Sequence, residues 1–305
     1  MPELPEVEVV RAGLAPAVTG ARVIGAEVLD PRALKRHLPP EAGRARSADF
    51  ERRVVGLRLA APERRGKFLW IPVAPERGGA EPGVALLAHL GMSGQLLLRS
   101  LEAADDRHVR IRLWIEHPAH GELRLDFADQ RLFGSLALDA LVPAPGGGTI
   151  PSQSGHIARD PLDPLFDDGA FVVALRSRAA GAKKLLLDQT LVSGVGNIYA
   201  DEALWRARLH PEAPGRSLGP RKARELLTRV REVFAQALAE GGTSFDAQYV
   251  NVNGRAGYFA RELEVYGRTG QPCSRCGGPI KRTAFMNRSS HFCPKCQRFR
   301  GSRSS

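Results

Sequence analysis

Cys273-Ser-Arg-Cys276 and Cys293-Pro-Lys-Cys296 form two Cys-x2-Cys pairs, separated by 16 residues, near the end of a 305-residue chain. This spacing is typical of a zinc ribbon, in which four thiolates surround one tetrahedral ion. Disulfides are the competing interpretation. They are disfavoured because the first ten residues carry three glutamates and no signal-peptide pattern, so we expect a cytosolic protein with reduced thiols. We therefore predict one structural Zn²⁺ bound by Cys273, Cys276, Cys293 and Cys296.

The residues between the two pairs predict a small β-hairpin. Residues 279–283 and 290–292 have the composition of short strands, and residues 285–288 would lie at the tip. The region is too short and polar to hold a core, so metal binding would supply its folding free energy. Arg288 is the natural candidate to reach a phosphate from such a tip.

The net charge of +11 is concentrated in the same part of the chain. Residues 265–305 contain nine basic side chains and no acidic one, whereas the other 264 residues carry 35 basic and 33 acidic side chains. This distribution predicts an acidic partner that meets the C-terminal region. A solvated basic tail is the alternative, but the four cysteines favour a folded module that binds a polyanion.

The N-terminal half has the pattern of a mainly β domain. Short strand-like runs at 54–59, 67–73, 84–89 and 95–98 follow a helix-like segment at 3–14. The clearest signal is residues 109–115, which alternate apolar and polar side chains and turn into a second such run at 123–127. The 32 glycines and 22 prolines indicate many turns, and no apolar run is long enough to span a membrane. We expect a sandwich or barrel.

The second half has a helical pattern. Helices are expected at 168–178, 183–191, 198–209 and 217–240. Residues 142–164 are rich in proline and glycine, which indicates a linker between the two halves. Ser193-Gly-Val-Gly-Asn197 breaks the pattern between two helices. Glycine turns of this kind are structural in most proteins, but exposed amides at a helix start also bind anions, and Asn197 can cap that helix or donate to a phosphate. The basic zinc ribbon favours a DNA phosphate.

The chain begins Met1-Pro2-Glu3-Leu4-Pro5-Glu6. A small second residue permits removal of the initiator methionine, which would leave Pro2 with a free secondary amine. Such an amine can attack a carbon electrophile and form an iminium ion. Glu3 and Glu6 are three residues apart on one helix face and could transfer protons beside it. The alternative is a helix start with Pro5 and two glutamates that favour the helix dipole.

Together these segments resemble the bacterial formamidopyrimidine-DNA glycosylases, the repair enzymes that excise 8-oxoguanine. The landmarks occur in the order of that family: Pro2-Glu-Leu-Pro-Glu-Val-Glu8, Arg65-Gly-Lys67, His89-Leu-Gly-Met-Ser-Gly94, Leu187-Asp-Gln-Thr-Leu-Val-Ser-Gly-Val-Gly-Asn-Ile-Tyr199, Gly257-Tyr-Phe259, Val265-Tyr-Gly-Arg268 and the four-cysteine finger. The resemblance implies a multi-domain α+β protein. Its parts would be an N-terminal catalytic β-sandwich domain with a helix (1–138), a hinge (139–164), a helix-two-turn-helix domain with a lesion-capping loop (165–264), a zinc finger (265–299) and a flexible tail (300–305).

The resemblance also implies catalytic roles for four residues. Pro2 would be the nucleophile at C1′ of the damaged nucleotide, and Glu3 the acid/base partner at the opened sugar. Glu6 would support the active site, and Lys67 would lie near the lesion phosphate. The implied reaction is excision of an oxidised purine followed by β,δ-elimination through a Schiff base on Pro2, carried out by a monomer on damaged double-stranded DNA in the nucleoid.

Further residues would contact the DNA. Met92, Arg131 and Phe133 resemble the residues that fill the gap left by an everted base, although core packing is the alternative for Met92 and Phe133. Lys184, Asn197 and Arg288 would bind backbone phosphates. Tyr249 belongs to a glycine-rich segment, residues 245–259, that corresponds to the loop closing over the flipped purine.

Two positions depart from the family pattern. Leu132 stands where an arginine or lysine often follows the position of Arg131, and small residues around Ala180 stand where the family has a lysine. Both imply fewer phosphate contacts. An endonuclease VIII-like glycosylase for oxidised pyrimidines is the nearest alternative, although the segment 245–259 favours a reader of oxidised purines. A nonenzymatic zinc-ribbon protein that binds DNA is the alternative from another class.

Overall fold

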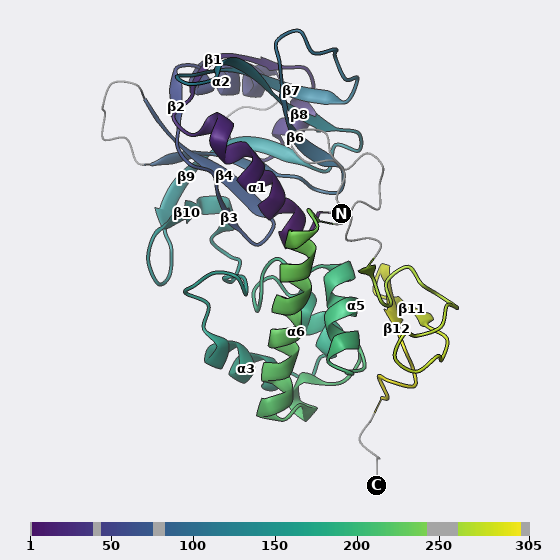
Figure 1. The fold of residues 1–305 in the computed structure, drawn as a ribbon. Helices are drawn as coiled ribbons and strands as arrows, with labels where there is room; N and C mark the ends of the chain where they lie inside the picture. Colours follow the sequence, from purple (N-terminus) through teal and green to yellow (C-terminus); the bar gives the residue numbers. More distant parts are fainter. Residues whose placement is uncertain (1, 39–43, 76–82, 243–261, 300–305) are drawn as a thin grey trace. The chain divides into compact units, whose positions relative to one another are not determined.

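The computed structural model describes residues 2–38, 44–75, 83–242 and 262–299, which belong to two compact units. Unit 1 comprises Met1–His156 and Gly241–Gly257, and unit 2 comprises Ile157–Glu240 and Tyr258–Ser305. Within the described ranges, no helix is both long enough and apolar enough to cross a membrane. Each unit is built around its own elements (Figure 1).

Ten antiparallel strands form one continuous sheet in unit 1. They are β1 (Arg22–Val28), β2 (Leu57–Leu59), β3 (Glu63–Arg65), β4 (Phe68–Pro75), β5 (Val84–His89), β6 (Gly94–Arg99), β7 (Val109–His117), β8 (Gly121–Asp129), β9 (Ser135–Pro143) and β10 (Thr149–Pro151). Their order is β10-β9-β5-β4-β2-β1-β7-β8-β6, and β3 pairs with β4 beside this path.

The expected alternation in β7 is confirmed and shows how the sheet makes its core. Ile111, Leu113 and Ile115 are fully buried, and Leu113 lies opposite Leu125 of β8. One cluster of buried apolar side chains includes Leu138 of β9 and Leu96 of β6, which lie near opposite ends of the strand order. The sheet therefore folds over a common core, as a sandwich does. The burial of alternate residues fixes the register, because a slip by one residue would expose the whole set.

Two helices cover this core. Helix α1 (Leu4–Val18) buries Leu4, Val7, Val10 and Leu14, the apolar stripe of the expected helix, and continues one turn further than expected. Helix α2 (Arg44–Val54) and the short 3-10 helix η1 (Pro31–Leu34) were not expected.

Two expected boundaries differ from the structure. Residues 54–59 were expected to be one strand, but Val54 ends α2 and only Leu57–Leu59 forms β2. Phe50 and Val54 are fully buried four residues apart, so a helix buries both on one face. In the segment expected as a linker, Ile150 of β10 is buried and pairs with Val142 of β9. The proline-rich composition therefore conceals an edge strand, where proline is tolerated.

Unit 2 is helical and carries a two-stranded sheet. Its helices are α3 (Asp168–Arg176), α4 (Ala182–Leu187), α5 (Asn197–Arg206) and α6 (Pro220–Ala239), with the 3-10 helix η3 (Gly215–Ser217). Another 3-10 helix, η2 (Ser152–Ser154), belongs to unit 1. Helices α5 and α6 lie side by side (Figure 1), and the rings of Tyr199 and Phe234 meet edge to face at 5.5 Å between centroids. All four expected helices are confirmed. Each ends earlier than expected, α6 also begins later, and α4 and α5 each begin one residue earlier.

The zinc-ribbon region of unit 2 contains β11 (Lys281–Phe285) and β12 (Arg288–Phe292) as an antiparallel hairpin. Phe285 pairs with Arg288, so Met286 and Asn287 form the turn. The hairpin lies beside α5 (Figure 1). The expected hairpin is therefore confirmed, but its strands extend further toward the tip than expected, so Phe285 and Arg288 belong to the strands and not to the turn.

Candidate catalytic and DNA-binding sites

Pro2, Glu3 and Glu6 lie together at the buried start of α1. Each of the two glutamates is 2% exposed. Glu3 is the N-cap residue, and its backbone N–H donates to Oε2 of Glu6 over 2.8 Å, as in a capping box. Pro5 lies in the first turn, where its missing N–H removes no helical hydrogen bond. The same local rules that start the helix therefore hold two carboxyl groups next to Pro2.

Gly242 contacts this corner from a distant part of the chain. Its φ of +87° is in the left-handed region, and a Cβ at this position would lie 3.2 Å from Oε1 of Glu6. A side chain here would both strain the backbone and crowd the carboxylate. The close approach explains why glycine suits this position.

Met92, Arg131 and Phe133 lie on two adjacent loops of unit 1. Met92 is 40% exposed and Phe133 is 52% exposed, so the core-packing alternative is wrong for both. Arg131 is exposed as well. Two large apolar side chains and one cation on a single edge suit insertion between stacked bases, as wedge residues do. We call the loops that carry these residues, 90–94 and 130–134, the wedge loops.

A buried carboxylate joins the wedge loops. Oδ1 of Asp129 accepts from the hydroxyl of Ser93 at 2.5 Å and from the backbone N–H of Arg131 at 3.1 Å, and Oδ2 accepts from the N–H of Gly134 at 2.6 Å. Asp129 is 1% exposed. A Cβ on Gly91 would lie 2.4 Å from the carbonyl carbon of Phe133, so the two backbones are in direct contact. Sequence analysis did not single out Asp129. An aspartate shortly before Phe133 gives no signal in the sequence, and its role appears only when the loop that contains Ser93 lies beside it.

Lys67 lies in the two-residue turn that joins β3 and β4. Arg65 pairs with Phe68, and Gly66 between them has a φ of +56°. Glycine at the first position of such a turn matches the twist of the two strands. This turn presents the partly exposed Lys67 at the end of the hairpin.

His89 lies near Lys67 and two further cations, Lys35 and Arg36. It was not among the expected site residues. Phe68, next to Lys67, pairs with His89 across β4 and β5. Nδ1 of His89 accepts from the N–H of Gly91 at 3.2 Å, so the imidazole proton is assigned to Nε2. Burial, together with the charges of Arg36, Lys67 and Lys35, lowers the pKa of His89 to about 4. A neutral donor among three cations is suited to a phosphate oxygen.

Asn197 is the first residue of α5 and is 6% exposed. Gly196 is the N-cap, so of the two alternatives for Asn197 the capping one is wrong. Its Nδ2 donates to the backbone carbonyl of Ser289 over 3.1 Å, and its buried Oδ1 has no hydrogen-bond partner among the described residues. The second hydrogen on Nδ2 is a donor that an anion could use.

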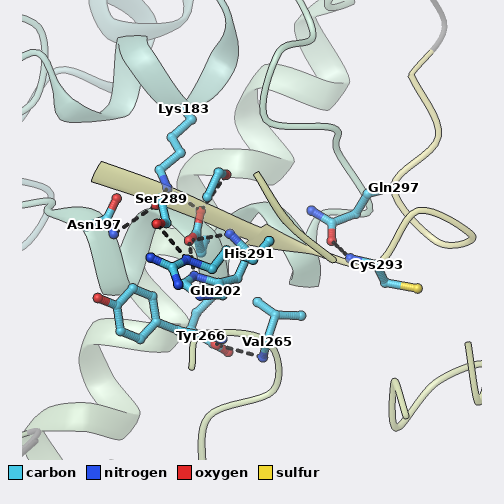
Figure 2. A network of polar contacts seen from close by, with 12 residues as sticks. Lys183, Asn197, Glu202, Val265, Tyr266, Ser289, His291, Cys293 and Gln297 are labelled. Carbon is cyan, nitrogen blue, oxygen red and sulfur yellow. Dashed lines mark hydrogen bonds and ion pairs between the residues drawn. The ribbon is translucent and has the colours of Figure 1, made fainter. Parts of the chain in front are cut away.

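Lys184 and Arg288 are both exposed on unit 2. Lys184 lies on α4, where its neighbour Lys183 is fully buried instead. Figure 2 shows that Lys183 points into a polar network with Asn197, Ser289 and His291. Sequence reasoning missed Lys183 because two adjacent lysines on a short helix give no signal of which one faces inward. Tyr249 and the rest of segment 245–259 lie outside the described residues.

Four cysteine sulfurs gather within 4.8 Å of one another. Sγ of Cys273 is 4.0 Å from that of Cys296, and Sγ of Cys276 is 3.5 Å from that of Cys293. Tetrahedral zinc with bonds of about 2.3 Å places its sulfurs about 3.8 Å apart, which fits this set. All four cysteines are free of disulfides, so that alternative is wrong. The four thiolates hold one structural Zn²⁺.

The protein around Cys273 favours a thiolate. Burial opposes ionisation, but hydrogen bonds from the Trp205 indole and from the backbone N–H groups of Arg275 and Cys276 lower the pKa of Cys273 to about 7. Nε1 of Trp205 lies 3.4 Å from Sγ of Cys273. The guanidinium of Arg275 stacks on the Trp205 ring, with Cζ 3.9 Å from the ring centroid. Trp205, Val265 and Ile280 pack with the cysteines, so the metal site is joined to α5.

The two units therefore combine a DNA-binding zinc ribbon on a helical scaffold with a β-sandwich that carries acidic groups and a basic edge, which is the architecture of a DNA-repair glycosylase. Family models match three segments: the formamidopyrimidine-DNA glycosylase N-terminal domain at residues 1–136, its H2TH domain at 157–248, and a zinc finger found in FPG and IleRS at 270–298. The chain belongs to the formamidopyrimidine-DNA glycosylase family.

Individual relatives agree over nearly the whole chain. A formamidopyrimidine-DNA glycosylase of Leifsonia xyli subsp. xyli is 60% identical, and the alignment covers 98% of this chain and 100% of the relative. A crystal structure of a Lactococcus lactis Fpg variant with DNA containing Fapy-dG is 31% identical, with a TM-score of 0.80, and the match covers 98% of this chain and 100% of that one. The wild-type Lactococcus lactis protein with DNA containing an oxidised pyrimidine is 31% identical, with a TM-score of 0.78 and the same coverage of both chains.

These matches establish a DNA glycosylase and abasic-site lyase of base-excision repair. The alternative of a nonenzymatic zinc-ribbon protein is therefore wrong.

Proposed function

We propose that this glycosylase excises oxidised purines, 8-oxoguanine and formamidopyrimidines, from duplex DNA and then cuts the abasic strand by β,δ-elimination. The observation that carries the proposal is the buried start of α1, where Pro2 adjoins Glu3 and Glu6. A nucleophilic amine with adjacent carboxyl groups is what Schiff-base chemistry at a sugar requires. The match to a protein bound to DNA with Fapy-dG supports the purine assignment.

The Pro2 nitrogen bonds to C1′ while the bond from C1′ to the base breaks, and the proton lost by the amine goes to the departing base. Glu3 delivers a proton to the sugar ring oxygen as the ring opens to the iminium ion. The iminium ion acidifies the C2′ hydrogen, which passes to the Glu3 carboxylate or to water while the 3′ phosphate leaves. A second proton, from C4′, passes to water while the 5′ phosphate leaves, and water then hydrolyses the iminium and frees Pro2. Glu6 holds the backbone of Glu3 in place through its 2.8 Å hydrogen bond.

The amine exists only after Met1 is removed, because in the full chain the Pro2 nitrogen is part of a peptide bond. Proline at position 2 is small enough for that removal. Mass spectrometry of the intact protein should therefore show a mass lower by one methionine. A protein that retains Met1 and still cuts abasic DNA would contradict the assignment of Pro2.

The remaining candidates bind DNA without reacting. Met92 and Phe133 occupy the gap left by the everted base, and Arg131 pairs with the orphaned cytosine. The phosphates are bound by Lys67, Lys184, Asn197 and Arg288, to which we add His89, and Tyr249 contacts the everted purine. Because phosphate contacts release counterions, the affinity should fall steeply with salt.

Borohydride trapping tests the covalent step. Pro2→Gly should lose most of the trapped complex with lesion DNA, whereas Glu3→Gln should lose base excision on intact lesions. Full excision by Glu3→Gln would refute its role. Lys184→Ala removes an exposed cation to which we assign no part in the covalent step. It therefore serves as the matched control and should weaken binding without abolishing trapping.

Excision of oxidised pyrimidines is the second candidate, because the Lactococcus lactis protein was crystallised with DNA containing one. Parallel single-turnover assays on 8-oxoguanine opposite cytosine and on thymine glycol separate the two. We expect faster excision of 8-oxoguanine, and the reverse order would favour the pyrimidine assignment.

We further propose that one chain acts on each lesion, in the nucleoid. Light scattering should then give a mass near 33.1 kDa.

A further inference from the structure

Lys183 of α4 and Asp201 of α5 form an ion pair with no exposure to solvent. Nζ of Lys183 lies 2.7 Å from Oδ1 of Asp201, and both side chains are 0% exposed. Removing two charges from water costs free energy that their attraction rarely exceeds, so such a pair is weak evidence for stability. Its function is better sought in the geometry that it imposes.

The carboxylate of Asp201 also holds two consecutive residues of β12. Oδ1 accepts from the Ser290 hydroxyl at 3.1 Å, and Oδ2 accepts from the backbone N–H of His291 at 2.9 Å. Nδ1 of His291 is 3.4 Å from the same oxygen. One buried side chain on α5 therefore fixes the position of the second strand of the zinc-ribbon hairpin.

The next residue toward the hairpin tip is held by two further donors. The carbonyl oxygen of Ser289 accepts from Nζ of Lys183 at 2.9 Å and from Nδ2 of Asn197 at 3.1 Å (Figure 2). Ser289 directly follows Arg288. Asn197 and Asp201 are four residues apart on α5, so they lie on the same face of that helix. Three consecutive residues after Arg288 are thus bound by side chains from α4 and α5.

Other contacts, which do not involve Asp201, also attach the zinc ribbon to α5. The carboxylate of the neighbouring Glu202 accepts hydrogen bonds from the backbone N–H groups of Glu264, Val265 and Tyr266 at 2.9–3.0 Å. Trp205 packs against the cysteines. These contacts join the base of the ribbon to α5. Asp201 instead acts on the strand that carries Arg288.

We propose that Asp201, through its bonds to Lys183 and β12, is a positioning residue that sets the spacing between Asn197 and Arg288. The proposal rests on the proposed function, in which these two residues bind backbone phosphates near the lesion. Asp201 itself touches no DNA. It keeps two separate donors at the separation that neighbouring phosphates require, and so lowers the entropy lost on binding.

The test measures binding of a duplex with a tetrahydrofuran abasic analogue, which the enzyme cannot cut. Asp201→Asn should retain one zinc per chain but bind about tenfold more weakly, the loss expected for one charged phosphate contact. The slope of log affinity against log salt should fall by about one, because one phosphate contact is lost. Asp168→Asn is the matched control, since this exposed carboxylate of unit 2 pairs with Arg231, away from β12. It should change neither quantity.

A double-mutant cycle distinguishes positioning from general destabilisation. Asp201→Asn combined with Arg288→Ala should bind no more weakly than Arg288→Ala alone. Additive losses, or an unchanged salt slope in Asp201→Asn, would overturn the proposal.

If Asp201→Asn does not fold because Lys183 is left uncompensated, Lys183→Met with Asp201→Leu removes both charges. This variant should fold but keep the weakened binding, whereas binding equal to that of the wild type would overturn the proposal. Failure of the proposed function looks different, because the wild-type chain would then show no preference for the lesion duplex.

Discussion

The hydroxyl of Ser93 donates to Oδ1 of Asp129 over 2.5 Å, and this bond joins two loops 36 residues apart in the sequence. The same oxygen also accepts from the backbone of Arg131, and the other carboxylate oxygen accepts from Gly134. Met92, Arg131 and Phe133 therefore depend for their relative positions on one buried carboxylate.

Asp129→Asn should disturb the wedge loops, because it replaces a carboxylate that accepts from three donors with an amide that can accept at only one oxygen. We expect a loss of about 2–4 kcal/mol in the free energy of unfolding. Excision of 8-oxoguanine should fall more than trapping on an abasic site, where no base has to be everted. Ser93→Ala should lose about 1 kcal/mol. Equal losses on both DNA substrates would contradict a role in eversion.

Gly91→Ala should be far more damaging than Gly20→Ala. Both glycines have a positive φ, +62° and +88°, but an added Cβ meets the Phe133 backbone at 2.4 Å in the first case and no atom within 4 Å in the second. Gly20→Ala therefore measures the backbone cost alone, about 1–2 kcal/mol. Urea denaturation should show at least about 2 kcal/mol more for Gly91→Ala. Similar losses would show that the wedge loops separate easily.

His89 predicts acid sensitivity in unit 1. Its pKa in the native protein is about 4, against 6.5 for the ordinary side chain, because burial and three neighbouring cations disfavour its charged form. The unfolded chain binds more protons between these values. The stabilisation is present above pH ~6.5 and is lost as the pH falls toward ~4, by on the order of 3 kcal/mol.

The comparison that isolates this effect is His89→Gln, which should have a flatter dependence of unfolding free energy on pH across that window. His120→Gln, which replaces an exposed histidine of unit 1, is the control and should follow the wild type. If His89→Gln and the wild type fall in parallel, another group is responsible.

Removal of zinc should unfold the ribbon and leave unit 1 intact. Metal binding contributes about 10–16 kcal/mol in small zinc modules, which residues 265–299 cannot replace with apolar burial. Chelation should therefore abolish DNA binding and change the fluorescence of Trp205, whose indole lies 3.4 Å from a zinc ligand. Added Zn²⁺ should restore both. A chelated protein that still binds lesion DNA with full affinity would contradict this account.

Local patterns in the sequence predicted most elements, because their causes act over short distances. The alternation at 109–115 predicted β7, and the stripe of Leu4, Val7, Val10 and Leu14 predicted α1. Composition misled at residues 149–151, where prolines and glycines conceal an edge strand. The helix α2 was missed because its polar residues outweigh Phe50 and Val54, whose burial comes from the tertiary structure.

The sequence by itself determined the zinc ligands and the acidic start of α1, since fixed spacings bring both sets together within one turn or hairpin. Only the tertiary structure decided which groups hold the site in place. Asp129 and Asp201 each bond to residues far away in the chain, and nothing near them in the sequence indicates their partners. The choice of Lys183 rather than Lys184 for the interior was also made by packing. Long-range contacts depend on how whole elements pack, and short patterns in a sequence do not encode that.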